Sequence, residues 1–240
     1  DSKIAMWATY GAARAIWIHD LDRGVTRRLA SEASSWAVWG PGAEDVTFRR
    51  SEAQSIERIG MLRLGSAEAA FKPIESDGQA FVADWTPGGE RLIAVRPTSG
   101  GSVLEQFIPG SGWTRLSTDA ATNEVWPAVS PDGKWLAYAS PESGALEVYV
   151  RPLLDSGATQ QVSIGGGMSP LWSRDGKELF YRAARADTDH PRGSVASVAI
   201  TEVNGRLQIG KPVMLFADKP EYGRTGPIRS WDVAADGRFL

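Results

Sequence analysis

Residues whose types and spacing could support chemistry are few in this sequence. His190 follows Asp187 and Asp189, and an imidazole beside two carboxylates can ligate a metal cation. His19 is the only other histidine, so a Ser-His-Asp arrangement would need one of these two. Three glycines at 165–167 precede a predicted strand, whereas a phosphate-binding loop leads into a helix. We therefore expect no catalytic constellation, no bound metal and no cofactor.

A short phrase recurs along the chain and predicts how its elements are arranged. It reads as an apolar residue, two linking residues, an Asp-Gly pair or its equivalent, a charge and an apolar strand. Residues 129–138 (VSPDGKWLAY) and 172–181 (WSRDGKELFY) are the clearest copies, and 85–94 and 39–48 are weaker ones. Aspartate tolerates the backbone conformation of the turn, and glycine supplies the positive φ with which the chain leaves the turn for the next strand. We expect this structural turn role for Asp132, Gly133, Asp175, Gly176, Gly88, Gly89, Asp236 and Gly237.

The spacing of these hairpins indicates the fold class. The turn positions Gly42, Gly88, Asp132 and Asp175 follow one another at steps of 46, 44 and 43 residues. A repeat of about 40–50 residues made of short strands is typical of a β-propeller blade. We predict an all-β fold, a β-propeller of four-stranded antiparallel blades in one domain over residues 1–240. The units are expected at about 1–35, 36–80, 81–123, 124–167 and 168–228, with a partial unit at 229–240.

Two segments admit more than one interpretation. Residues 52–64 have a pattern that fits either a helix or two strands in register with the repeat, and we take the strands. Residues 182–194 form a polar insertion, which is a candidate specificity loop or tolerated surface.

Both ends of the sequence fall inside the repeated phrase. Residues 1–6 align with 132–137, and residues 233–240 form a sixth copy that stops at its second strand. In one interpretation the strand at 230–234 completes the first blade and closes a five-bladed ring. In the other, the chain is a fragment of a ring with six or more blades, of which about five are visible. We expect the second interpretation, a fragment of a larger ring.

The composition limits the partner and the location. The 240 residues carry a net charge of −3, which argues against a broad nucleic-acid surface. No cysteine is present, so disulfides and thiolate metal sites are excluded. No stretch approaches the roughly 18 apolar residues of a membrane span. We expect no nucleic-acid partner, no direct membrane insertion by this segment and a location outside the cytoplasm, in the periplasm or cell envelope.

We expect the loops that connect successive blades to form the binding face, because propellers bind ligands at the funnel mouth of the central channel, where these loops gather. Polar loops of this kind suit a protein or peptide partner better than an apolar small molecule. The candidate residues on these loops are Asn123, Glu124, Gly166, Met168, Arg224 and Arg229.

Residues 123–138 (NEVWPAVSPDGKWLAY), followed by 147–153 (EVYVRPL), resemble TolB-like, WD-type propeller repeats that contain the SPDG motif. The resemblance is strongest over 113–181, and it is closest to the repeats on the C-terminal side of bacterial membrane-anchored serine/threonine protein kinases. It implies a non-catalytic sensor or interaction propeller outside the cytoplasm, and no catalytic residue carries over. Two alternatives remain open. One is the gating propeller of a prolyl-oligopeptidase-type hydrolase, and the other is a free-standing TolB-like envelope protein.

Overall fold

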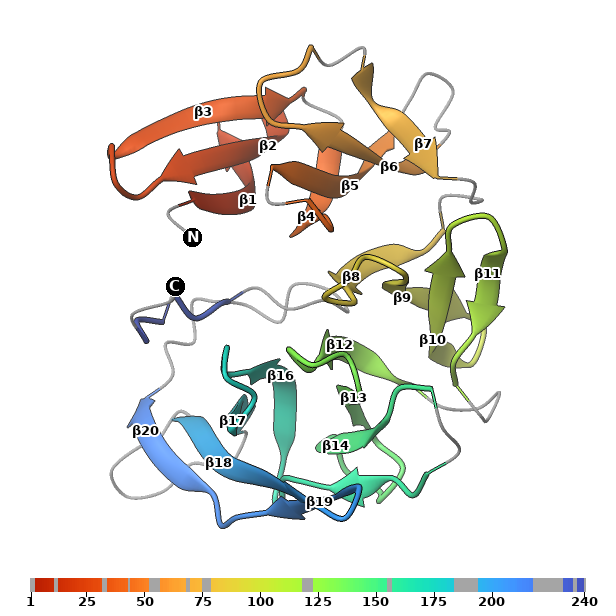
Figure 1. Ribbon diagram of the computed structural model, residues 1–240, viewed down its shortest axis with the longest axis vertical. Coiled ribbons are helices and arrows are strands. Elements are labelled where there is room, and N and C mark those ends of the chain that lie inside the picture. Colours follow the sequence, from red (N-terminus) through yellow and green to blue (C-terminus); the bar gives the residue numbers. More distant parts are fainter. Residues whose placement is uncertain are drawn as a thin grey trace. The chain divides into compact units, whose positions relative to one another are not determined.

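All elements that the structure describes are β-strands. A computed structural model describes residues 3–10, 13–31, 34–42, 44–51, 57–67, 70–74, 79–117, 123–154, 157–183, 194–217, 231–234 and 237–239 (Figure 1). Within these ranges the strands form five antiparallel sheets, which confirms the all-β prediction. The chain divides into two compact units: residues 1–97 with 105–114, and residues 98–104 with 115–240. The single domain over 1–240 stays a prediction.

Unit 1 holds two complete sheets. One has three strands in the order β1-β2-β3, and the other has four in the order β4-β5-β6-β7. The strands of the first are β1 (Lys3–Tyr10), β2 (Ala13–Asp20) and β3 (Val25–Ala30). Those of the second are β4 (Ser34–Trp39), β5 (Asp45–Ser51), β6 (Glu57–Arg63) and β7 (Lys72–Ile74). The ambiguous segment is thus a strand over 57–63, as expected, while residues 52–56 lie outside the described ranges.

A third sheet has the order β11-β10-β9-β8, and its residues are shared between the two units. Its strands are β8 (Phe81–Trp85), β9 (Leu92–Thr98), β10 (Gly101–Ile108) and β11 (Gly112–Arg115).

Unit 2 holds the remaining two sheets. The fourth sheet contains β12 (Val125–Val129), β13 (Trp135–Ser140), β14 (Glu147–Pro152) and β15 (Gln160–Gln161). The fifth contains β16 (Gly167–Trp172), β17 (Glu178–Ala183), β18 (Ser194–Val203), β19 (Arg206–Ile209) and β20 (Val213–Ala217). The long strand β18 pairs with β20 through residues 194–197 and with β19 through residues 200–203.

The core of unit 2 lies between its two sheets. Trp135 and Ala137 of β13 pack in one cluster with Leu179 and Tyr181 of β17. All six residues of β13 are buried, so both faces of this strand are covered. Burying a large apolar side chain contributes about 1.5–3 kcal/mol, and this cluster therefore fixes the two hairpins that follow from the repeated phrase.

Candidate functional site

The repeated turn is held by a serine hydroxyl as well as by the aspartate. The Ser130 hydroxyl donates to Asp132 Oδ1 at 2.5 Å and accepts from the N–H of Trp135 at 2.9 Å. Asp132 Oδ1 also accepts from the N–H of Lys134 at 3.1 Å, and Gly133 has φ 74°. The serine therefore links the turn to the strand that follows it.

The next copy repeats these contacts. The Ser173 hydroxyl donates to Asp175 Oδ1 at 2.7 Å and accepts from the N–H of Glu178 at 2.9 Å. Asp175 Oδ1 accepts from the N–H of Lys177 at 3.1 Å, and Gly176 has φ 70°. The aspartates at 132 and 175 are thus structural on one oxygen, and their second oxygens take no part in these bonds.

The earlier turn at 86–91 reaches the same result with other residues. Gly88 occupies the aspartate position, and the Thr86 hydroxyl accepts from the N–H of Arg91 at 3.0 Å. The carboxylate comes from Glu90, whose Oε2 lies 3.1 Å from the Thr86 hydroxyl. Gly89 has φ 76°.

The described residues of the sixth copy of the phrase lie in unit 2. Gly237, with φ 82°, donates its N–H to the carbonyl of Ala234 at 3.0 Å. Phe239 contacts Phe180 and Trp231, with ring centroids 5.2 and 5.7 Å apart. The sixth copy of the phrase therefore packs on the fifth sheet. Asp236 lies outside the described residues.

Two of the expected loop residues adjoin a buried network. Glu124 is 3% exposed and accepts from the Ser117 hydroxyl, while Arg151 Nη2 lies 3.7 Å from Glu124 Oε2. Asn123 is exposed, and its Oδ1 accepts from the Ser102 hydroxyl at 2.8 Å. Glu124 is therefore committed to contacts inside the molecule, and Asn123 alone of this pair faces solvent.

A polar layer continues from Glu124 into the fourth sheet. The Arg151 guanidinium lies 5.1 Å from the centroid of the Tyr138 ring, and burial raises the pKa of Tyr138 to about 12. Burial, and then repulsion from Glu124, raises the pKa of the Glu142 carboxyl. Arg151 Nη2 and the Tyr149 hydroxyl are buried without a hydrogen-bond partner among the described residues. Apart from the exposed Glu142, this layer is buried and presents little surface to a partner.

The glycine run serves a second buried carboxylate. Glu147, 3% exposed, accepts at Oε1 from the N–H groups of Gly165 and Gly166, both at 2.8 Å. Its Oε2 accepts from the Ser163 hydroxyl at 2.5 Å. The N–H groups of Gly165 and Gly166 are therefore occupied by the protein's own carboxylate, and that of Gly167 donates to the carbonyl of Leu146 at 2.9 Å. Met168 lies half-buried in β16.

The remaining candidate residues lie near the surface or outside the described ranges. His19 is near the surface, with its Nδ1 2.8 Å from the Thr26 hydroxyl. Arg224, Arg229 and the segment with His190 lie outside the described residues. Among the residues that the structure does describe, no group of three His, Asp or Glu side chains is placed to hold a metal ion. The same part of the chain contains no helix long and apolar enough to cross a membrane.

The first strands of three sheets, β4, β12 and β16, each contain a residue with positive φ, which the sequence pattern did not indicate. Trp36, Trp126 and Ser169 have φ values of 59°, 52° and 55°, and each lies at a register shift of its strand pair. Positive φ is rare for a bulky residue and is found where surrounding contacts impose it. Trp36 stacks on Trp7 with ring centroids 4.9 Å apart, and meets Phe81 edge-on at 5.4 Å. Packing of the ring thus accompanies the strained backbone at Trp36.

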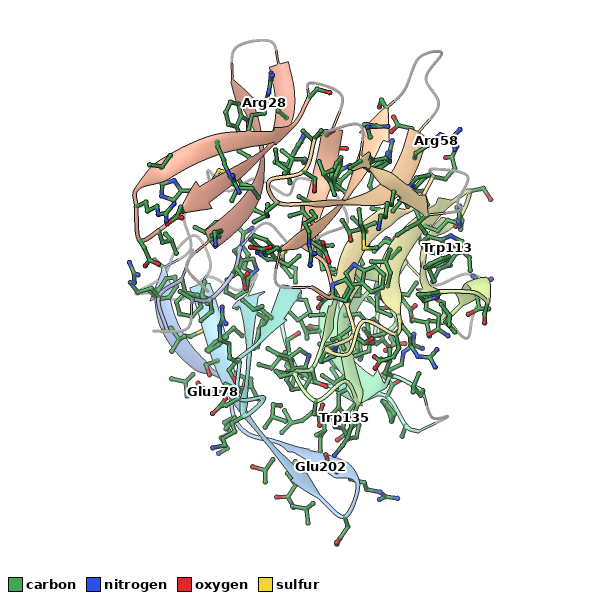
Figure 2. All side chains as sticks on the ribbon, turned by 45° about the horizontal axis from the view of Figure 1, so that its top comes forward. Arg28, Arg58, Trp113, Trp135, Glu178 and Glu202 are labelled. Carbon is green, nitrogen blue, oxygen red and sulfur yellow. The ribbon has the colours of Figure 1, made fainter. Side chains whose placement is uncertain are left out.

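A groove of about 270 Å³ lies between the turns at 130–135 and 173–178 in unit 2, and we call it the turn groove. Its apolar lining comes from Trp135, Trp172, Ile200 and Leu207, all members of the core cluster. Its acidic lining comes from Asp132, Asp175 and Glu202. Figure 2 labels Trp135 and Glu202, which come from β13 and β18.

The two aspartates of the turn groove, Asp132 and Asp175, have lowered pKa values and are ionised at neutral pH. Partial burial opposes ionisation of Asp132, but hydrogen bonds from the Ser130 hydroxyl and the Lys134 N–H outweigh it and lower its pKa. The hydrogen bond from the Ser173 hydroxyl, with that from the Lys177 N–H, lowers the pKa of Asp175. Lys134 Nζ lies 3.1 Å from Glu202 Oε2 and 3.6 Å from Asp132 Oδ2.

The lowered pKa values predict an acid sensitivity of these turns. The ionised aspartates stabilise the fold above their unfolded pKa of about 4, and this contribution is lost as the pH falls through the lower folded pKa. In D132N/D175N the amide oxygens still accept the turn hydrogen bonds without titrating. We expect the urea midpoint of the wild type to fall more than that of the variant between pH 6 and pH 3. Equal pH dependence of the two proteins would contradict this assignment.

The corresponding turns of unit 1 lie closer together than the two turns of the turn groove. An ideal Cβ at Gly89 would lie 2.2 Å from Pro41 Cβ, so these two turns touch, whereas one at Gly176 would lie 3.7 Å from Pro131 Cδ. Gly42 and Gly88 stand where the later turns have aspartate. A second cavity in unit 1, of about 330 Å³, is lined instead by an ion pair in which Arg63 Nε lies 3.4 Å from Asp45 Oδ1.

The hairpin repeat and the four-stranded antiparallel sheets define a β-propeller fold of the TolB-like type. TolB from Acinetobacter baumannii matches 89% of this chain with a TM-score of 0.69 at 19% identity, and the chain spans 54% of that protein, about half its length. The nidogen–laminin complex matches 83% of the chain, with a TM-score of 0.61 and 12% identity, and 72% of the matched protein is covered.

A puromycin hydrolase shares the fold as well. It matches 99% of this chain with a TM-score of 0.57 at 17% identity, and the chain spans 39% of it. No protein-family model and no curated protein sequence matches the chain. At these identities the likeness shows the fold, while function has to be argued from the site.

Proposed function

We propose that the chain is a non-catalytic binding propeller that takes a protein or peptide partner. The turn groove carries this proposal, because an apolar floor beneath a charged rim is the common form of a recognition site. Its walls belong to hairpins fixed by core packing, so the site is formed before a partner arrives. The nidogen–laminin complex supports a protein partner by analogy of fold alone.

We also propose that the propeller serves as one domain of a bacterial serine/threonine protein kinase. The resemblance of residues 113–181 to repeats beside bacterial serine/threonine kinases supports a role as the extracytoplasmic sensor or interaction domain of such a kinase. Sequencing the reading frame on both sides tests this role. A kinase domain and a membrane helix upstream would support it, and a hydrolase domain downstream would refute it.

The match to a puromycin hydrolase favours a second candidate function, a gating propeller of a prolyl-oligopeptidase-type hydrolase. In that case the groove would face no partner protein, and binding of free peptides to the chain would be independent of the groove residues. A free-standing TolB-like envelope protein is the remaining alternative, and stop codons at both ends would identify it.

Selection of peptides on the purified chain tests the proposed function. A random peptide library is panned against the chain, and the affinity of enriched peptides is measured by calorimetry. We expect micromolar peptides whose affinity falls at least fivefold in the groove variant L207Q, which makes one apolar wall residue polar. The control L154Q alters an exposed leucine outside the groove and leaves affinity unchanged. Enriched peptides that bind both variants equally would refute the groove as the binding site.

A further inference from the structure

We infer that the turn groove receives an arginine side chain presented by the partner protein. This inference rests on the proposed function and names the chemistry of its ligand. The groove joins two surfaces that a long cationic side chain matches together: apolar walls for the carbon stem and carboxylates for the charged end. A neutral or acidic side chain would match only the walls, and it would meet three carboxylates at the rim.

The carboxylates of the two turns present their second oxygens outside the turn. Oδ1 of Asp132 and Oδ1 of Asp175 each accept from a serine hydroxyl and a backbone N–H, which fixes both side chains. Oδ2 of each residue lies 3.6–3.7 Å from the lysine two positions later, a distance too long for a hydrogen bond. Each Oδ2 is therefore an ordered acceptor, held in place at no further cost in side-chain entropy.

Lys134 shows that this rim accepts a cation. Its ammonium lies 3.1 Å from Glu202 Oε2 and donates a hydrogen bond to it, and the lysine side chain remains 61% exposed. Such an exposed pair is weak, so a better-matched cation can displace it. The contact with Glu202, and then the field of that carboxylate, raises the pKa of Lys134.

Arginine fits the rim better than a second lysine would. A guanidinium offers five N–H donors in a planar fork, whereas an ammonium is a compact point charge. The rim has carboxylates from two successive turns and from β18, so donors that spread in a plane can reach more than one of them. The guanidinium plane also stacks on indole rings, and Trp135 and Trp172 both line the groove.

The probe for this inference is N-acetyl-arginine amide, with N-acetyl-citrulline amide as its neutral isostere. Binding is followed by NMR through the indole N–H resonances of Trp135 and Trp172. We expect saturable shifts of both resonances with the arginine probe at millimolar concentration, and none with citrulline. At 0.5 M salt the shifts should shrink, because the rim is solvent-exposed. Equal shifts with citrulline, or larger shifts with N-acetyl-lysine amide, would overturn the inference.

Three variants complete the test. E202Q removes one rim charge at constant shape, and we expect about fivefold weaker binding of the arginine probe. K134M removes one of the two lysines beside the rim carboxylates, and we expect about threefold tighter binding. E90Q alters the exposed carboxylate of the corresponding turn in unit 1, and binding should not change. Unchanged affinity in both E202Q and K134M would contradict the assignment.

The result also separates this inference from the proposed function. Selected peptides that depend on Leu207 but show no preference for arginine would leave the binding function standing and refute the arginine site. If no peptide is enriched and the arginine probe does not bind, both fail.

Discussion

Replacing Ser163 with alanine will lower the free energy of unfolding of unit 2 by about 3 kcal/mol. The fully buried Ser163 hydroxyl accepts from the N–H of Val148 at 2.8 Å and donates to the carboxylate of Glu147. Alanine leaves a buried N–H without this acceptor and takes one donor from a buried charge. For a chain of this length, the melting temperature measured by calorimetry should fall by about 6–12 °C.

Ser143→Ala is the matched control for this prediction. Ser143 lies in an exposed turn of the same unit, so the same atom is removed where water replaces it. We expect a change in melting temperature of less than about 2 °C for this control. If S163A also melted within that limit, the hydroxyl would not be supporting Glu147, and the glycine N–H groups alone would hold the carboxylate.

Replacing Gly89 with alanine will destabilise unit 1 by about 3 kcal/mol. The residue has φ 76°, a conformation that costs a side chain about 1 kcal/mol. The new Cβ would also lie 2.2 Å from Pro41 Cβ. Relieving such overpacking costs a further ~1–3 kcal/mol. Urea denaturation followed by tryptophan fluorescence measures the loss.

Alanine variants at Gly24 and Gly176 separate the cost of backbone strain from the cost of overpacking. Gly24 has φ 63° with no atom within 4 Å of an ideal Cβ, so G24A should cost the backbone strain alone, about 1 kcal/mol. Gly176 has φ 70° and meets Pro131 only at van der Waals distance, so G176A should resemble G24A. A loss in G89A no larger than in G24A would mean that the two turns of unit 1 do not touch in solution.

The hairpins and the sheets could be predicted from the sequence because their determinants are local. The phrase around Asp132 combines a turn residue, a glycine and an alternating strand within ten positions, and the structure contains the antiparallel strands that this pattern favours. The role of Ser130 cannot be predicted from the same phrase, because a serine next to proline is common in loops and gives no sign that its hydroxyl bonds to the following strand.

The turn groove could not be predicted, because its residues come from separate strands. Glu202 and Leu207 follow the second turn by about 30 positions, and only the pairing of β18 with β17 brings them to Trp172. The burial of Glu124 was hidden for the same reason. Its partner Arg151 belongs to β14, and a polar residue at the end of a loop gives no sign that a long-range contact will cover it.

The turn at 86–91 shows that the carboxylate of this hairpin can come from a different position, two residues later, while the glycine with positive φ stays in place. Glu90 serves the Thr86 hydroxyl from beyond the turn, whereas Asp132 serves Ser130 from within it. Successive repeats can therefore drift in charge and shape at their tips while their hydrogen-bonded frame is conserved. The charge at the tip of one hairpin can accordingly change without loss of the hydrogen bonds that tie its turn to the following strand.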